Sequence, residues 1–162
     1  MPNWCTGDLK VRGKYKDIKE FLSKEMFILG GSIFKRTYEP PVINEDYGIE
    51  ISVGKEGMWF RNAYRSCLNS DIDIYIDFDD EENKDEQIIT ANLGELKTAW
   101  GTDTGALIKL SEQYDLDFKI YAYEKGMEFN IDFEVHKGKV IKNNEIKFDD
   151  YVWECTNPEI GG

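Results

Sequence analysis

The run Phe118-Lys119-Ile120-Tyr121-Ala122 opens the stretch of sequence that decides the fold. Apolar and polar residues alternate through it, and the alternation resumes after Lys125-Gly126 and continues over residues 127–135. A second turn, Lys137-Gly138, leads into residues 139–141. A period of two indicates strands with one face in the core, and short glycine-containing turns join such strands into hairpins. The sequence therefore predicts a three-stranded antiparallel meander.

A second alternating stretch precedes the meander. Residues 71–79 read Asp-Ile-Asp-Ile-Tyr-Ile-Asp-Phe-Asp and run into an acidic segment over residues 80–86. Residues 71–86 contain nine acids and one lysine, so they carry -8 of the net charge of -12. We expect a strand over residues 71–79, around which the rest of the chain is organised, followed by an acidic loop at about 79–86.

Two helices are predicted on either side of this strand. Apolar residues at helical spacing from Tyr15 to Met26 predict an amphipathic helix of about four turns, ended by Gly30-Gly31. Residues 102–104 offer side-chain oxygens that can cap a second helix, which should end near Asp115. The expected inner face of the second helix is Ala106, Leu107, Leu110 and Tyr114.

Shorter strands fill much of the remaining chain. The pattern predicts strands at residues 9–12, at 33–38 before Pro40-Pro41, and at 87–93. It also predicts a hairpin in which a four-residue loop joins residues 49–53 to 58–60, and it leaves 61–70 and 96–100 unassigned. This order of elements predicts an α+β fold with helices on one face of a mostly antiparallel sheet. The opposite face would be solvated and acidic.

Length and composition favour one acidic domain over residues 1–162, with a flexible tail at about 157–162. Residues 1–39 have a net charge of +3, whereas residues 40–162 have a net charge of -15. This balance opposes direct binding of nucleic acid and of anionic membranes. The absence of a signal peptide or membrane-spanning run predicts a cytoplasmic protein, and an odd count of three cysteines predicts reduced thiols.

No catalytic residues, metal site or cofactor are predicted. The aspartates of residues 71–79 lack the glycine and glutamate spacing of an EF-hand, and a strand separates alternate side chains by about 6.6 Å. A zinc site would need unpaired Cys5, Cys67, Cys155 and His136 to converge. Cys5 is better explained as packing than as a nucleophile, because one histidine leaves few possible bases.

Met1-Pro2-Asn3-Trp4-Cys5 resembles the start of the YubB/Api92-like family (DUF1281-type proteins of plasmids, phages and other mobile elements). Further along, Thr98-Ala99-Trp100, the helix segment 110–114 and the hairpin segment 123–129 resemble that family's threonine-x-tryptophan element, helix and hairpin. Gly101-Thr102 departs from the family's usual Pro-Pro. The resemblance implies a ferredoxin-like two-layer α+β sandwich and a home on a mobile genetic element, but it brings no catalytic residues.

Two binding hypotheses and one without binding follow. In the first, the chain is a non-enzymatic module whose acidic, DNA-mimicking surface binds a protein with a basic surface, as in an anti-restriction or anti-CRISPR inhibitor. The predicted binding residues are Asp71, Asp73, Tyr75, Asp77, Asp79, Asp80, Glu81 and Glu82, with Glu128, Asp132 and Glu134 as a second patch. In the second hypothesis the sheet binds nucleic acid, with Tyr121 and Tyr123 stacking on bases and Lys10, Arg12, Lys14, Lys16 and Lys19 contacting phosphates. The third is an uncharacterised soluble domain whose charge serves only solubility.

Overall fold

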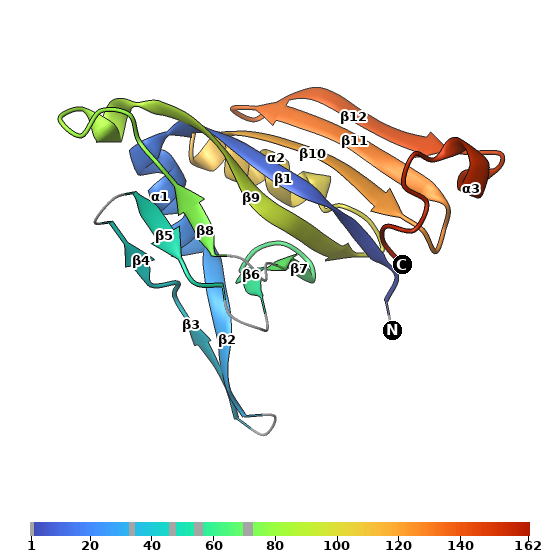
Figure 1. Cartoon of the computed structure of the whole chain (residues 1–162), viewed down its shortest axis with the longest axis horizontal. Coiled ribbons are helices and arrows are strands. Elements are labelled where there is room, and N and C mark those ends of the chain that lie inside the picture. Colours follow the sequence, from blue (N-terminus) through green and yellow to red (C-terminus); the bar gives the residue numbers. More distant parts are fainter. Residues whose placement is uncertain (1, 33–34, 46–47, 54–56, 70–72) are drawn as a thin grey trace.

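The computed structural model describes residues 2–32, 35–45, 48–53, 57–69 and 73–162 (Figure 1). The first part contains β1 (Trp4–Lys14), α1 (Tyr15–Glu25), β2 (Met26–Ser32), β3 (Lys35–Glu39), β4 (Ile43–Asn44), β5 (Ile49–Ile51), β6 (Met58–Phe60), β7 (Ser66–Asn69) and β8 (Ile74–Ile76). The second part contains the short 3-10 helix η1 (Lys84–Glu86), β9 (Ile88–Ala99), α2 (Thr104–Gln113), β10 (Asp117–Glu124), β11 (Phe129–His136), β12 (Lys139–Lys147) and α3 (Tyr151–Glu154).

Two sheets organise these elements. A nine-stranded sheet has the order β12-β11-β10-β1-β9-β7-β6-β2-β3, and a three-stranded sheet has the order β4-β5-β8. The strand pairs of both sheets are antiparallel. In the large sheet β1 lies between β10 and β9, so the N-terminal strand joins elements from distant parts of the chain.

The helices α1 and α2 cover one face of the large sheet, and the core lies between them and the strands (Figure 1). Each helix turns its apolar stripe inward, as its spacing predicts. Phe21 of α1 is fully buried, and its ring lies 5.3 Å from that of Phe118 in β10 and 5.9 Å from that of Tyr114 after α2. These aromatic contacts fasten both helices to the middle of the sheet.

The meander and the second helix are confirmed. β10, β11 and β12 pair in order, and Phe118, Ile120 and Ala122 point into the core. The second helix begins at Thr104, where the Asp103 side chain accepts a hydrogen bond from the Ala106 backbone N–H at 3.0 Å, and its predicted inner face is buried. Helices on one face of an antiparallel sheet are likewise confirmed, although the sheet has more strands than a two-layer ferredoxin-like sandwich requires.

The acidic strand is the main correction. Of the described residues 73–79, Ile74–Ile76 form a strand, and this strand lies at an edge of the small sheet, where it pairs with β5. Asp71 and Ile72 fall outside the described residues. Alternation correctly predicts that Ile74 and Ile76 are buried. Residues 77–79 are not part of the strand, and they begin the acidic loop. β1, rather than this strand, occupies the centre of the fold.

Three boundaries also differ from the prediction. The first helix ends at Glu25, because Met26 is already extended and starts β2, so Gly30-Gly31 lies within a strand and does not end the helix. β5 and β6 do not form a hairpin, because β5 belongs to the small sheet and β6 to the large one. The segments 87–93 and 96–100 join into a single strand, β9, of 12 residues.

The two ends of the chain meet beside β10. The Gly162 backbone N–H donates to the carbonyl oxygen of Trp4 at 2.9 Å, and Lys125 forms an ion pair with Glu159 at 2.5 Å. The predicted flexible tail therefore makes specific contacts in this structure.

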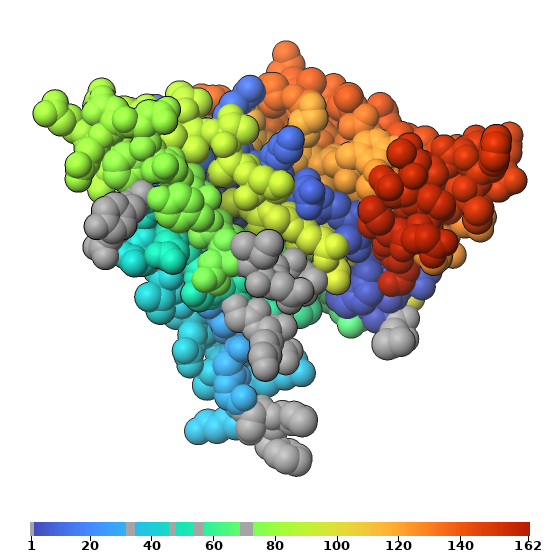
Figure 2. Space-filling view, viewed as in Figure 1, coloured from blue at the N-terminus to red at the C-terminus, as the bar shows by residue number. Residues whose placement is uncertain are grey.

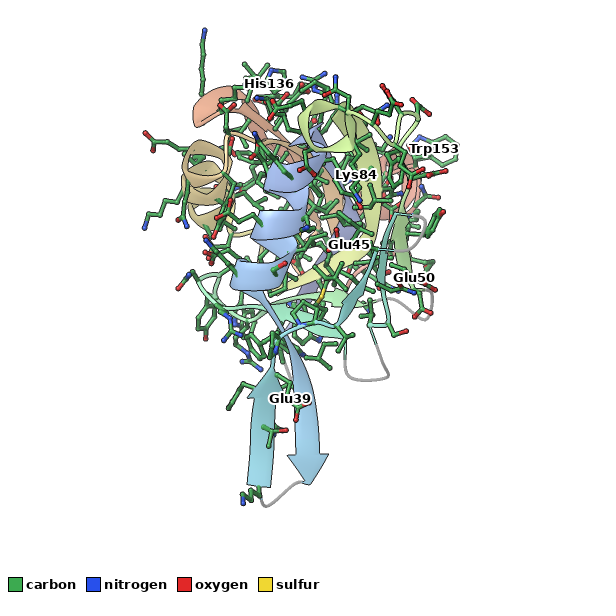
Figure 3. The ribbon with its side chains drawn as sticks, turned by 90° about the vertical axis from the view of Figure 1, so that its left-hand side faces the viewer. Glu39, Glu45, Glu50, Lys84, His136 and Trp153 are labelled. Atoms are coloured by element: carbon green, nitrogen blue, oxygen red, sulfur yellow. The ribbon has the colours of Figure 1, made fainter. Side chains whose placement is uncertain are left out.

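At the β3 edge of the large sheet the β2–β3 hairpin projects beyond the body, with Glu39 near its base (Figure 3).

Candidate protein-interaction surface

The acidic loop is defined here as residues 77–85. Contacts with Tyr15, the first residue of α1, anchor the chain at both ends of this loop. The Phe78 ring packs edge-on against Tyr15 with 5.6 Å between centroids, and Lys84 Nζ lies 5.5 Å from the centre of the same ring. After the loop, the Gln87 carbonyl oxygen accepts a hydrogen bond from the Tyr15 backbone N–H at 2.9 Å. These contacts fix where the loop leaves the body of the molecule.

Two lysines hold the residue that follows the loop. Lys14 Nζ lies 2.6 Å from Glu86 Oε2, and Lys16 binds the other carboxylate oxygen of Glu86. Hydrogen bonds from these ammonium groups lower the pKa of Glu86 from its usual value to about 2. Arg12 also pairs with Asp117, and Lys19 with Glu45. Intramolecular ion pairs therefore neutralise much of the positive charge of the N-terminal segment.

The carboxylates of the acidic loop differ from Glu86 in having no cationic partner. All are exposed, and none forms an ion pair with any residue that the structure describes. They are Asp77, Asp79, Asp80, Glu81, Glu82 and Asp85. The loop protrudes as the green knob at the upper left of Figure 2. Uncompensated like charge on a protruding loop produces a strong local negative field.

The loop borders a hollow of about 450 Å³ between β8 and β9. Asp77 and Asp79 line it together with Tyr75 from β8 and Ile88 from β9. Tyr75 is 55% exposed and Ile88 is 62% exposed, so the hollow offers two apolar side chains beside the carboxylates. Aromatic and apolar residues within a charged rim are typical of protein interfaces. Ile88 was not among the predicted site residues.

The structure does not bring the second acidic patch to this surface. Asp132 and Glu134 lie on β11 of the large sheet, where Asp132 pairs with Lys142 at 3.1 Å and Glu134 with Lys119 at 2.9 Å. Glu134 also lies 2.7 Å from Nε2 of His136. Glu128 lies in the turn that precedes β11. Because lysines oppose two of its three acids, this patch does not continue the field of the acidic loop.

A family model for the ferredoxin-like domain in Api92-like proteins matches residues 73–158. This chain belongs to that family. The matched region begins at β8 and includes the acidic loop, β9, α2, the meander and α3, whereas β1 and α1 precede it. Neither the comparison with curated proteins nor that with solved structures found a match. The family assignment confirms the predicted resemblance.

The Api92-like domain contains β9 and β10, yet β1 from outside the match pairs between them. Without β1 and α1 both strands would lose a partner, Phe78 of the acidic loop would lose its contact with Tyr15, and Glu86 would lose its ion pairs with Lys14 and Lys16. The acidic surface of this family member therefore depends on the N-terminal segment as well as on the matched domain.

Cys5 and His136 lie apart. Arg12 of β1 lies opposite Asp117 of β10, which lies opposite His136 of β11. Because Cys5 is seven residues from Arg12 on β1, Cys5 and His136 are separated by about 23 Å along the strand direction. Burial raises the pKa of Cys5 and raises that of Cys67 to about 11. Within the described residues no three histidine, cysteine or acidic side chains are grouped to hold a metal, and no helix there is long and apolar enough to span a membrane.

The ion pairs of Glu86 predict a pH dependence of stability. Because folding lowers the pKa of Glu86, these pairs stabilise the folded state above the unfolded value of 4.5, and the contribution is lost as the pH falls towards about 2. We expect wild type and Glu86→Gln to differ most in melting temperature at pH 7 and to converge by pH 2. Glu81→Gln, which removes an unpaired carboxylate, is the matched control. A difference for Glu86→Gln that stays constant from pH 7 to pH 2 would contradict the assignment.

Proposed function

We propose that this family member is a non-enzymatic protein-interaction module, and that its acidic loop binds the basic surface of a protein partner. The observation that carries the proposal is the contrast between Glu86, which pairs with two lysines, and the six exposed carboxylates beside it, which pair with no cation among the described residues. Charge left uncompensated on an anchored, protruding loop is well placed to steer and hold a cationic partner.

The partner that best fits this surface is a protein that normally binds nucleic acid. Such proteins hold phosphates with clusters of lysine and arginine, and a dense group of carboxylates competes for the same side chains. The mimicry rests on charge density and not on regular spacing, because residues 77–85 do not form a strand. Tyr75 and Ile88 would add apolar contact beside the charges.

The family resemblance suggests the biological setting of the proposal. Proteins encoded on mobile genetic elements gain from blocking restriction or CRISPR enzymes, whose nucleic-acid grooves are basic. We therefore propose a counter-defence inhibitor as the expected role, with no catalytic residue and no cofactor of its own.

A comparative pull-down tests this function. Wild-type protein and Glu81→Lys/Glu82→Lys/Asp85→Lys are used to capture proteins from host lysate under washes of increasing salt. The three residues are exposed and form no side-chain hydrogen bond or ion pair within the described residues, so their reversal should leave the melting temperature nearly unchanged. We expect wild type alone to retain a basic nucleic-acid enzyme, and high salt to release it.

The matched control reverses two exposed acids away from the loop, Glu112→Lys/Asp149→Lys, neither of which forms an ion pair with a described residue. This control should capture the same enzyme as wild type. Recovery of identical proteins by wild type and the loop variant, or of no basic enzyme by wild type, would reject the proposal.

A further inference from the structure

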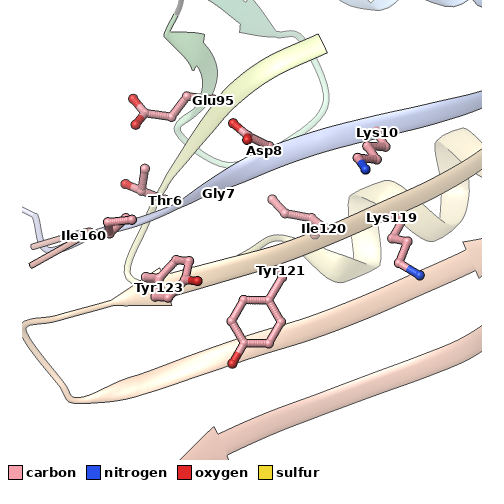
Figure 4. A pocket seen from close by; sticks show the side chains of 10 residues that line it. All are labelled: Thr6, Gly7, Asp8, Lys10, Glu95, Lys119, Ile120, Tyr121, Tyr123 and Ile160. Carbon is pink, nitrogen blue, oxygen red and sulfur yellow. The ribbon is translucent and has the colours of Figure 1, made fainter. Parts of the chain in front are cut away.

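The open face of the large sheet contains a second hollow, which the acidic loop does not line. It has a volume of about 390 Å³ and lies over β1 and β10, and the charged and aromatic residues that line it are Lys10, Lys119, Tyr121, Tyr123, Asp8 and Glu95 (Figure 4). The volume falls within the range of sites that hold small ligands, about 300–1,000 Å³. We propose that this hollow binds a free nucleotide, with its ring against the two tyrosines and its phosphate at the two lysines.

An irregularity of the sheet lies beside the hollow. The register between β1 and β9 shifts between Asp8 and Lys10, and Gly94 on β9 adopts a φ of +89°. On the other side, a side-chain carbon added to Gly7 would lie 2.2 Å from the Tyr121 carbonyl oxygen, so the backbones of β1 and β10 approach closely there. Bulges of this kind are frequent next to functional sites because they redirect side chains.

The two lysines make an unbalanced pair. Lys10 and Lys119 lie directly opposite each other on neighbouring antiparallel strands, an arrangement that costs stability when the charges are alike. Glu134 balances Lys119 at 2.9 Å, whereas Lys10 forms no ion pair with any residue that the structure describes. A bound phosphate would supply the negative charge that Lys10 lacks.

The tyrosines form a fixed aromatic wall beside these lysines. Their rings meet edge to face with centroids 5.3 Å apart. The Tyr121 hydroxyl accepts a hydrogen bond from Asn130 Nδ2 at 3.2 Å, and the Tyr123 hydroxyl accepts one from Asn157 Nδ2 at 3.2 Å. Tyr121 nevertheless remains 40% exposed, so a planar ring can stack on it without rearrangement.

Asp8 should make the site bind a complete nucleotide more tightly than inorganic phosphate. Its side chain is exposed, lines the hollow on the same strand as Lys10, and has no ion-pair partner among the described residues. A carboxylate in such a position accepts hydrogen bonds from ribose hydroxyls or from a base amino group. The net charge of -12 favours a free nucleotide over a long nucleic acid, whose many phosphates the whole protein would repel.

Titration with AMP, GMP, CMP and UMP, followed by amide chemical shifts, tests the proposal. At least one should bind with a dissociation constant below about 1 mM. The matching nucleoside and inorganic phosphate should each bind at least about tenfold more weakly, because each makes half of the contacts. Shifts should centre on Lys10, Lys119 and Tyr121. If none of the four nucleotides binds, the proposal is overturned.

Two variants localise the binding. Lys10→Glu should weaken it at least about tenfold, because it places a carboxylate beside the phosphate. Lys109→Glu changes the net charge equally on α2, on the other face of the sheet, and should leave the affinity within about twofold. Equal weakening by both would show a general charge effect and overturn the site. Tighter binding of a single-stranded oligonucleotide of the same base would overturn the assignment to a free nucleotide.

Discussion

Phe21→Ala is expected to lower the free energy of unfolding by about 3–5 kcal/mol, the usual cost of truncating a buried phenylalanine. Phe21 is fully buried and contacts aromatic rings from three other parts of the chain. Its ring centroid lies 5.3 Å from that of Phe118, 5.9 Å from that of Tyr114 and 6.1 Å from that of Phe60. The variant therefore leaves a cavity where α1, α2 and both halves of the large sheet meet.

Urea unfolding followed by circular dichroism measures this loss. Val152→Ala is the control, because Val152 is 72% exposed and its truncation should change the free energy by less than about 0.5 kcal/mol. A loss below about 1 kcal/mol for Phe21→Ala would mean that α1 does not pack on the sheet as described.

Gly7→Ala is expected to be the second most damaging of the single substitutions considered. The added methyl group would lie 2.2 Å from the Tyr121 carbonyl oxygen and 2.8 Å from Ala122 Cα, both of them backbone atoms that cannot rotate away. β1 and β10 would have to separate, at a cost of about 1–3 kcal/mol or more. The same separation should disturb the hollow between Lys10 and Tyr121, so nucleotide binding should weaken as well.

Gly105→Ala is the matched control for Gly7→Ala. Gly105 is exposed in the first turn of α2, and the nearest atom to an added methyl group is 3.7 Å away. Because alanine favours a helix over glycine by up to about 1 kcal/mol, this variant should be neutral or more stable. Thermal unfolding distinguishes the two variants, and equal melting temperatures would contradict the close approach of β1 and β10.

Local periodicity predicted those elements whose neighbours in sequence are also their neighbours in space. The meander is such a case, since β10, β11 and β12 pair in chain order. The Asp103 cap and the buried stripe of α2 are equally local. Alternation from Ile49 onward also identified β5 correctly as a strand, but it could not show that β8 pairs with it while β6 joins the other sheet. Sheet membership depends on contacts between distant segments.

The acidic stretch shows the second limit of sequence reasoning. Alternation over residues 71–79 predicted one continuous strand, yet among the described residues of this stretch the strand covers Ile74–Ile76 and the ladder ends there. Composition correctly located the charge on residues 77–85. It could not show that Lys14 and Lys16 neutralise Glu86, or that lysines neutralise Asp132 and Glu134. Gly7 in β1 and Gly94 in β9, two glycines within strands, were sequence signals for the irregular sheet at the hollow over β1 and β10.

The affinity of the captured basic protein for the acidic loop, measured calorimetrically at several salt concentrations, tests the central claim most directly. Wild type should bind at least about tenfold more tightly than Glu81→Lys/Glu82→Lys/Asp85→Lys at low salt, and the two affinities should converge as salt screens the charges. Glu112→Lys/Asp149→Lys should bind as wild type does. Equal affinities of wild type and the loop variant at low salt would contradict the assignment of partner binding to the acidic loop.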